Sequence, residues 1–150
     1  MLRADWEANI NAILTRSAEQ ADLYADAADH VVGKAAALCR KMAERRRALA
    51  DALETALRNK GRLPKEMDPD RETADKWMTA VRSALSGHEA ESLLHSRLAA
   101  DENLDHAIAE AMADSELPAD LRAVLDRFWT DLDSDRHELA AFLGSGNAPQ

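Results

Sequence analysis

The sequence predicts an all-α protein, a four-helix bundle, on the basis of three observations. Four long segments carry apolar residues at alternating steps of three and four, the spacing that places them on one face of a helix. Alanine and leucine dominate an apolar fraction of 46%, and aromatic residues make up only 4%, a composition that favours helices over strands. The 5 glycines and 4 prolines fall mostly between these segments.

The first two helices are predicted over residues 5–32 and 34–60. Inward positions are expected at Trp6, Ile10, Ile13, Ser17, Gln20, Tyr24, Ala27 and Val31 in the first helix, and at Leu38, Met42, Arg45 or Arg46, Leu49, Leu53 and Leu57 in the second. Gly33 and Gly61 follow these segments, where a left-handed residue commonly ends a helix. Because the connection at Gly33 is short, we expect an antiparallel pair.

Two further long helices are predicted over residues 88–113 and 118–143. Their inward positions are expected at Leu94, Leu98, Asp101, Asp105, Ile108 and Met112, and at Leu121, Leu125, Phe128, Leu132, Asp135, Leu139 and Leu143. Asp68 and Pro69 predict a short extra helix over residues 69–85, since they fit the N-cap and first helical positions. Such a helix spans about 24 Å, so we expect a long crossover that makes the third long helix parallel to the second. Residues 1–143 then form a single domain, followed by a flexible tail over 144–150.

The net charge of −9 and the single cysteine indicate which partners and which cell compartment to expect. An acidic surface repels phosphate backbones, so we expect no nucleic-acid partner. No apolar stretch approaches the roughly 20 residues of a membrane span, and residues 1–7 lack a signal-peptide core. Cys39 cannot form an intramolecular disulfide, which is typical of a reducing compartment, and we expect it to be a buried apolar side chain. We therefore predict a cytoplasmic protein of bacterial type with no membrane partner.

Polar residues interrupt each inward face near its centre, and we expect them to meet in one layer. The predicted layer contains Ser17, Gln20, Arg45, Arg46, Asp101, Asp105, Asp131 and Asp135. Bundles that bind two metal ions place Glu and Glu-x-x-His ligands at this level. The sequence contains no Glu-x-x-His, and its histidines (His30, His88, His95, His106 and His137) are predicted to point away from the inward faces.

Arginine weighs against a metal in this layer, because a guanidinium stays protonated and cannot be a ligand. We expect a buried Arg–Asp network with no metal and no cofactor. Two alternatives stay open: the charged side chains extend to solvent, or the four aspartates hold a hard cation such as Mg²⁺, Ca²⁺ or Mn²⁺. Tyr24 is expected to be a core aromatic residue whose hydroxyl binds Gln20, Arg46 or water, rather than a redox residue.

Several short segments are similar to those of a known group. They are residues 24–28 (YADAA), residues 42–46 (MAERR), Gly61, Trp77 and residues 101–102. In these, the chain resembles small bacterial ferritin-like proteins of unknown function, relatives of the stress-induced ferritin-like proteins, over about residues 10–143. The resemblance implies a ferritin-like bundle able to form dimers, with no established enzyme activity. Where that group usually has an acidic pair in the first helix, this chain has Glu19 and Gln20.

Two hypotheses about function follow. The first is a non-catalytic bundle, not an enzyme, that acts in a stress response or by binding a partner; no nucleotide or catalytic-triad motif is present. Apolar residues outside the main stripes, Leu23, Leu93 and Leu104, favour a homodimer or another protein partner. The alternative is a degenerate iron- or manganese-binding protein that uses the aspartate cluster. A helix-exchanging adaptor is disfavoured by the short turns.

Overall fold

The computed structural model describes residues 5–62 and 87–144. These form four long helices, α1 (Asp5–Ala28), α2 (Gly33–Asn59), α4 (Gly87–Ala113) and α5 (Ala119–Gly144), with no strand among the described residues. The predicted all-α, four-helix class is therefore confirmed. The helix expected over 69–85 and residues 145–150 of the expected tail lie outside the described residues, and Gly144 belongs to α5 rather than to a tail.

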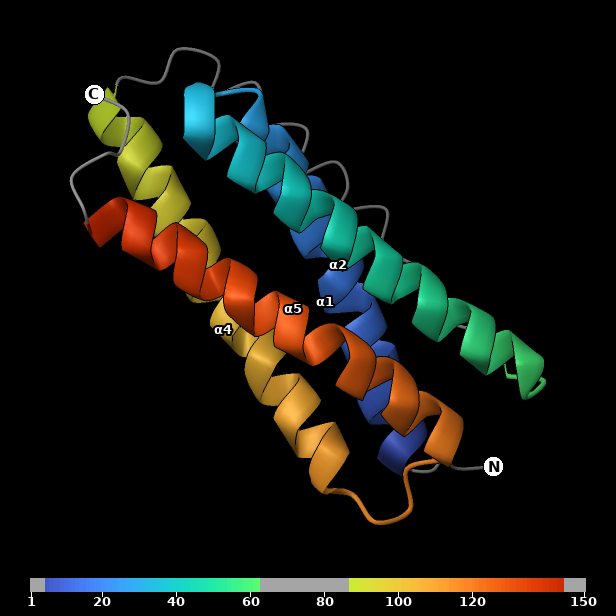
Figure 1. The fold of residues 1–150 in the computed structure, drawn as a ribbon. Helices are drawn as coiled ribbons and strands as arrows, with labels where there is room; N and C mark the ends of the chain where they lie inside the picture. Colours follow the sequence, from blue (N-terminus) through green and yellow to red (C-terminus); the bar gives the residue numbers. More distant parts are fainter. Residues whose placement is uncertain (1–4, 63–86, 145–150) are drawn as a thin grey trace.

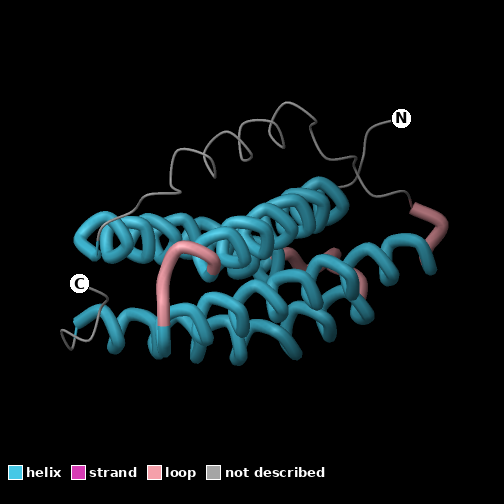
Figure 2. Tube along the Cα trace, turned by 90° about the horizontal axis from the view of Figure 1, so that it is seen from above, coloured by secondary structure: helices cyan, strands magenta, loops and turns pink. Residues whose placement is uncertain are grey.

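The helices run along one another in a bundle (Figure 1), and each of them borders two others. α1 packs most extensively against α2, α4 borders α1, and α5 borders both α2 and α4. Seen from above, they form two layers of two helices (Figure 2). The end of α1 and the start of α2 share one apolar cluster with the start of α4 and the end of α5. Neighbouring helices are thus antiparallel, and the diagonal pair α2 and α4 runs in the same direction.

Two glycines with positive φ angles shape the ends of α2. Gly61 (φ 73°) follows the helix, and its N–H donates to the carbonyl of Arg58 while the N–H of Arg62 donates to the carbonyl of Leu57, both at 2.9 Å. This pair of bonds satisfies carbonyls that have no partner inside the helix. Gly33 (φ 62°) begins α2. α1 ends at Ala28, four residues earlier than predicted, because residues 29–32 form the turn.

A side chain from α5 holds the second tight connection in place. Arg122 donates from Nη1 to the carbonyl of Met112 and from Nη2 to the carbonyl of Asp114, each at 2.7 Å. These carbonyls lie at the end of α4, so the arginine caps one helix from the next. The Asp114 carboxylate accepts the N–H of Glu116 at 2.9 Å, which tightens the turn. α5 therefore returns directly along α4.

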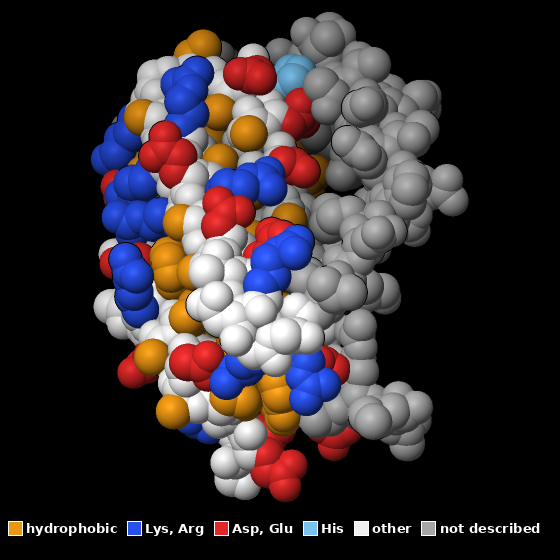
Figure 3. All heavy atoms as spheres, turned by 90° about the vertical axis from the view of Figure 1, so that its right-hand side faces the viewer, with side chains coloured by type: hydrophobic (Ala, Val, Ile, Leu, Met, Phe, Trp, Pro, Cys, Tyr) orange, Lys and Arg blue, Asp and Glu red, His pale blue; other side chains and the backbone are white. Residues whose placement is uncertain are grey.

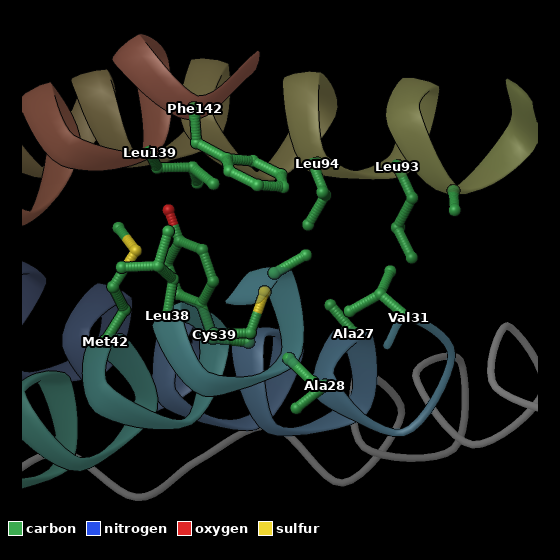
Figure 4. Packing of buried hydrophobic residues seen from close by; sticks show 14 of the residues in the cluster. Ala27, Ala28, Val31, Leu38, Cys39, Met42, Leu93, Leu94, Leu139 and Phe142 are labelled. Carbon is green, nitrogen blue, oxygen red and sulfur yellow. The ribbon is translucent and has the colours of Figure 1, made fainter. Parts of the chain in front are cut away.

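The apolar core consists of two clusters, one toward each end of the bundle. The first contains Tyr24, Ala27, Val31, Leu38, Cys39, Met42, Leu93, Leu94, Leu139 and Phe142, with Leu143 and further alanines. In Figure 4 its side chains from α1 and α2 point toward those from α4 and α5. The second contains Ile10, Ile13, Leu49, Leu53, Leu57, Leu104, Ile108, Leu121, Leu125 and Leu132, with others. Polar side chains from all four helices lie between the clusters.

The inward face of α4 differs from the prediction. Leu93 and Leu104, predicted to lie outside the main stripe and available to a partner, are buried in the two clusters. Asp105, predicted to point inward, is only half-buried. α4 carries apolar residues on more than one side. Helical spacing alone therefore does not decide which of these sides faces the bundle interior. Two of the three apolar residues that favoured dimerisation are thus part of the monomer core.

The described surface is polar and mixed in charge. On the face shown in Figure 3, Lys and Arg side chains lie beside Asp and Glu side chains, with small hydrophobic areas between them. Val32 and Trp129 are the large hydrophobic residues that this part of the chain exposes. None of the described helices combines the length and the hydropathy that crossing a membrane requires.

Candidate functional site

Arg46 of α2 lies at the centre of the bundle, with an exposure of 0%. Its Nε donates to Asp101 Oδ1 at 3.1 Å, and its Nη2 donates to Asp101 Oδ2, so the guanidinium and the carboxylate of α4 face each other as two forks. Its Nη1 lies 3.5 Å from Oδ2 of Asp135, on α5. One buried guanidinium thus joins carboxylates from two other helices.

Tyr24 of α1 completes the surroundings of this guanidinium. The Arg46 guanidinium carbon lies 5.4 Å from the centre of the tyrosine ring, a cation–π distance. The hydroxyl donates to the backbone carbonyl of Arg97 at 3.4 Å, a partner that was not among those predicted. Burial, and then the charge of Asp101, raise the pKa of Tyr24 well above its usual value, so the hydroxyl remains a neutral donor.

Asp135 connects the buried centre of the layer to its solvent-exposed edge. Its Oδ1 accepts from Arg45 Nη1 at 2.9 Å and lies 3.6 Å from Lys41 Nζ. Burial raises the pKa of this carboxyl, and the charges of Arg45, Arg46 and Lys41 only partly oppose the shift. Lys41 also donates to Glu138 at 2.8 Å, and this hydrogen bond lowers the pKa of the exposed Glu138.

The other two predicted aspartates do not enter the layer. The Asp131 side chain is 59% exposed, with its Oδ1 3.8 Å from Arg45 Nη1. Asp105 lies on the outer side of α4 and α5, where it accepts from Trp129 Nε1 at 2.7 Å and lies 3.4 Å from Arg136 Nη2. The aspartate cluster expected from the sequence is therefore divided between the interior and the surface. Within residues 5–62 and 87–144, no three His, Cys, Asp or Glu side chains are placed to hold a metal ion.

Arg97 is a buried member of the layer that the sequence analysis missed. It is 8% exposed and lies on α4, one turn before Asp101. Its charge acts on Tyr24, whose pKa it lowers slightly against the larger effect of burial. The signal was present in the spacing, because Arg97 and Asp101 continue the buried positions from Leu94 to Leu104 at steps of three and four. Ser17 and Gln20 of α1 are buried at the same level.

The remaining reactive side chains lie outside the layer. His95, His106 and His137 are exposed, and the side chain of His88 lies outside the described part of the chain. His30 differs from the prediction, since it is half-buried with its Nδ1 2.8 Å from the carbonyl oxygen of Asp26. Cys39 is fully buried, and burial raises its pKa to about 11, so it remains a thiol rather than a nucleophilic thiolate.

The charged side chains of this arrangement contact one another across the helices. The carboxylate oxygens that face the bundle interior accept from or face guanidinium and ammonium groups, so a cation must displace Arg46 to reach them. Comparison with known proteins identifies no relative: no family model, no curated protein and no solved structure matches the chain significantly. The ferritin-like resemblance therefore stays a prediction.

Proposed function

We propose that this chain is a non-catalytic helical bundle of ferritin-like connectivity, in which an Arg–Asp network takes the place of a di-metal centre, and that it acts by binding a second copy or another protein. The single observation that carries the proposal is the position of Arg46. Its guanidinium is fully buried between Asp101 and Asp135, two carboxylates that a metal would need. A permanent cation at this point neutralises carboxylate charge that would otherwise attract a metal, and a guanidinium cannot itself be a ligand.

The direction of the helices supports the ferritin-like connectivity. α2 ends beside the second apolar cluster, whereas α4 begins beside the first, so the two ends lie at opposite ends of the bundle (Figure 1). An up-down-up-down bundle would instead start its third helix where the second one ends. A single long connection between parallel second and third helices is the arrangement of ferritin-like folds.

Partner binding is supported by the surface of α5. Trp129 is 40% exposed, and its Nε1 is held by Asp105 on α4. An indole ring fixed in this way loses little further freedom when another protein covers it, and tryptophan is enriched at the centres of protein interfaces. Sedimentation velocity of the wild type and of Trp129→Ala tests the dimer. The wild type should sediment as a dimer, and the Kd of dimerisation should be at least tenfold higher for the variant.

The replacement of a metal by arginine is tested by thermal melting with Fe²⁺ or Mn²⁺, together with elemental analysis of the purified protein. A metal that binds the native state raises the Tm. We expect less than one metal ion per ten chains and no rise in Tm for the wild type.

Arg46→Glu provides the matched control for this measurement. The variant places a third carboxylate beside Asp101 and Asp135, so it should gain stability or structure on addition of Mn²⁺. A wild type that melts at a higher temperature with metal would overturn the proposal. A rise confined to the variant would support it.

A further inference from the structure

Four buried side-chain atoms of the polar layer have no hydrogen-bond partner among the described residues. They are Ser17 Oγ, Gln20 Oε1, Arg46 Nη1 and Asp135 Oδ2. Their residues come from α1, α2 and α5, and the most exposed of them, Gln20, is only 6% exposed. Arg46 Nη1 and Asp135 Oδ2 form an ion pair at 3.5 Å but no hydrogen bond. A buried polar atom without a hydrogen bond is unfavourable, so native proteins rarely keep several of them in one layer without a bound polar molecule.

The chemistry of these atoms favours a ligand that both donates and accepts hydrogen bonds. Arg46 Nη1 can only donate, whereas Asp135 Oδ2 and Gln20 Oε1 can only accept, and Ser17 Oγ can do both. A cation would satisfy the two acceptors but would be repelled by the guanidinium. An anion would accept from the guanidinium but would be repelled by the Asp135 carboxylate. A small neutral molecule with donors and acceptors fits all four, and water is the smallest.

The distances also suit water. Arg46 Nη1 and Asp135 Oδ2 lie 3.5 Å apart, so one water oxygen about 2.8 Å from each can accept from the first and donate to the second. Ser17 and Gln20 are three residues apart on α1, which places their Cβ atoms about 5–6 Å from each other on one face. One water can bridge side-chain atoms at that separation.

A pocket connects this layer to the side of the bundle. It lies between α1 and α4, has a volume of about 600 Å³, and is lined by Gln20, Arg16 and Ala100 among others. Arg16 and Ala100 directly precede Ser17 and Asp101, members of the polar layer, so the pocket reaches the edge of the layer. Water can therefore enter without unfolding of the helices.

We propose that the polar layer is an internal hydration site, in which ordered water molecules bridge Arg46 to Asp135 and Ser17 to Gln20. Bound water completes the hydrogen bonds of the network and exchanges through the α1–α4 pocket. The site depends on the burial of these atoms and not on the absence of a metal, so it holds whether or not the proposed function is correct.

Oxygen-17 magnetic relaxation dispersion of the full chain tests this site, because it counts waters held longer than the protein takes to tumble. The wild type should show a dispersion step equal to at least one such water. Ser17→Ala should lose a share of the step equal to one water, since it removes the Oγ that holds it. Ser134→Ala makes the same change at an exposed position beside Asp135 and should leave the step unchanged.

Two results overturn the hydration site: a wild type without a dispersion step, or equal steps in all three proteins. Should Ser17→Ala fail to fold, the wild type alone decides, through the cross-relaxation between water and the guanidinium protons of ¹⁵N-labelled Arg46. Cross-peaks to water at Arg46 support the site, and their absence in a spectrum that resolves these protons overturns it.

Discussion

Arg45 and Arg46 are neighbours in sequence and approach the same carboxylate, yet their surroundings differ. Arg46 is 0% exposed and is enclosed by Asp101, Asp135 and the ring of Tyr24. The Arg45 side chain is 35% exposed and reaches Asp135 and Asp131 from the edge of the bundle. The two residues form the centre and the rim of one network, and the comparison isolates the effect of burial on otherwise similar ion pairs.

The two arginines differ in what surrounds a charge once its ion-pair partner has been removed. At the rim, water solvates a charge whose partner is removed, and such pairs contribute little to stability. At the centre, the remaining charge stays buried without compensation, which is strongly unfavourable. The central pair therefore selects the native arrangement of the four helices by penalising others, and this selection does not require that the pair adds net stability.

The largest expected effect follows the removal of one central partner. Asp101→Ala leaves the Arg46 guanidinium buried with its main hydrogen bonds lost, and should lower the free energy of unfolding by about 3–5 kcal/mol. Urea denaturation followed by circular dichroism measures the loss.

Asp131→Ala is the matched control, because it removes an exposed aspartate from the same network and should change stability by less than about 0.5 kcal/mol. Equal and small changes in the two variants would mean that Arg46 reaches solvent and that no closed centre exists.

Replacing the whole central group should reverse this loss. The triple variant Arg46→Met, Asp101→Leu, Asp135→Leu exchanges these three buried charged groups for apolar side chains. It should be as stable as the wild type or more stable by about 1–4 kcal/mol, because the desolvation of these three charged groups is removed together with their pairing. The same denaturation measurement applies. A triple variant as unstable as Asp101→Ala alone would show that the network adds net stability.

Asp135 and Glu138 extend the comparison to pH, since both contact Lys41 but their pKa values shift in opposite directions. Burial raises the pKa of Asp135 above 3.8, whereas the hydrogen bond from Lys41 lowers the pKa of Glu138 below 4.5. The native state therefore holds the Asp135 proton more tightly than the unfolded chain does, and the contribution of Asp135 to stability falls as pH rises from 3.8 through its folded pKa. The contribution of Glu138 is complete above pH 4.5 and is lost as pH falls through its folded pKa.

Carbon-13 NMR of the carboxyl groups measures both titrations, and unfolding of Asp135→Asn and Glu138→Gln as a function of pH provides the controls. The stability difference between wild type and Asp135→Asn should decrease with rising pH in this window, while that for Glu138→Gln should increase. If the pKa values of both carboxyl groups shifted in the same direction, the assignment of Asp135 to the buried centre and of Glu138 to the rim would be wrong.

Sequence spacing predicted the inward faces of α1 and α2 well, because each has a single apolar stripe that polar residues interrupt only near its centre. Arg46 was predicted at the level of the layer, but spacing alone could not distinguish it from Arg45, which lies 100° away on the helix. α4 was harder, since Leu98 lies on a different side of the helix from Leu93 and Leu104, and a charged Arg97 occupies an inward position. Which aspartate faces which arginine depends on how helices distant in sequence are rotated against each other, and no single helix encodes that rotation.

The smallest expected effect is at the rim. Arg45→Ala removes the 2.9 Å contact with Asp135, but Lys41 and Arg46 remain near that carboxylate. The loss of stability should be below about 1 kcal/mol at low salt. Because the Debye length falls to about 3 Å at 1 M salt, the difference from the wild type should nearly vanish there.

Urea denaturation in 0.05 M and 1 M NaCl measures this dependence, with Arg46→Ala as the comparison. Arg46 is shielded from mobile ions by the bundle, so the loss in Arg46→Ala should persist at high salt. Salt-insensitive loss in Arg45→Ala would place both arginines in the buried centre. A difference in burial could then no longer explain different effects of the two arginines on stability.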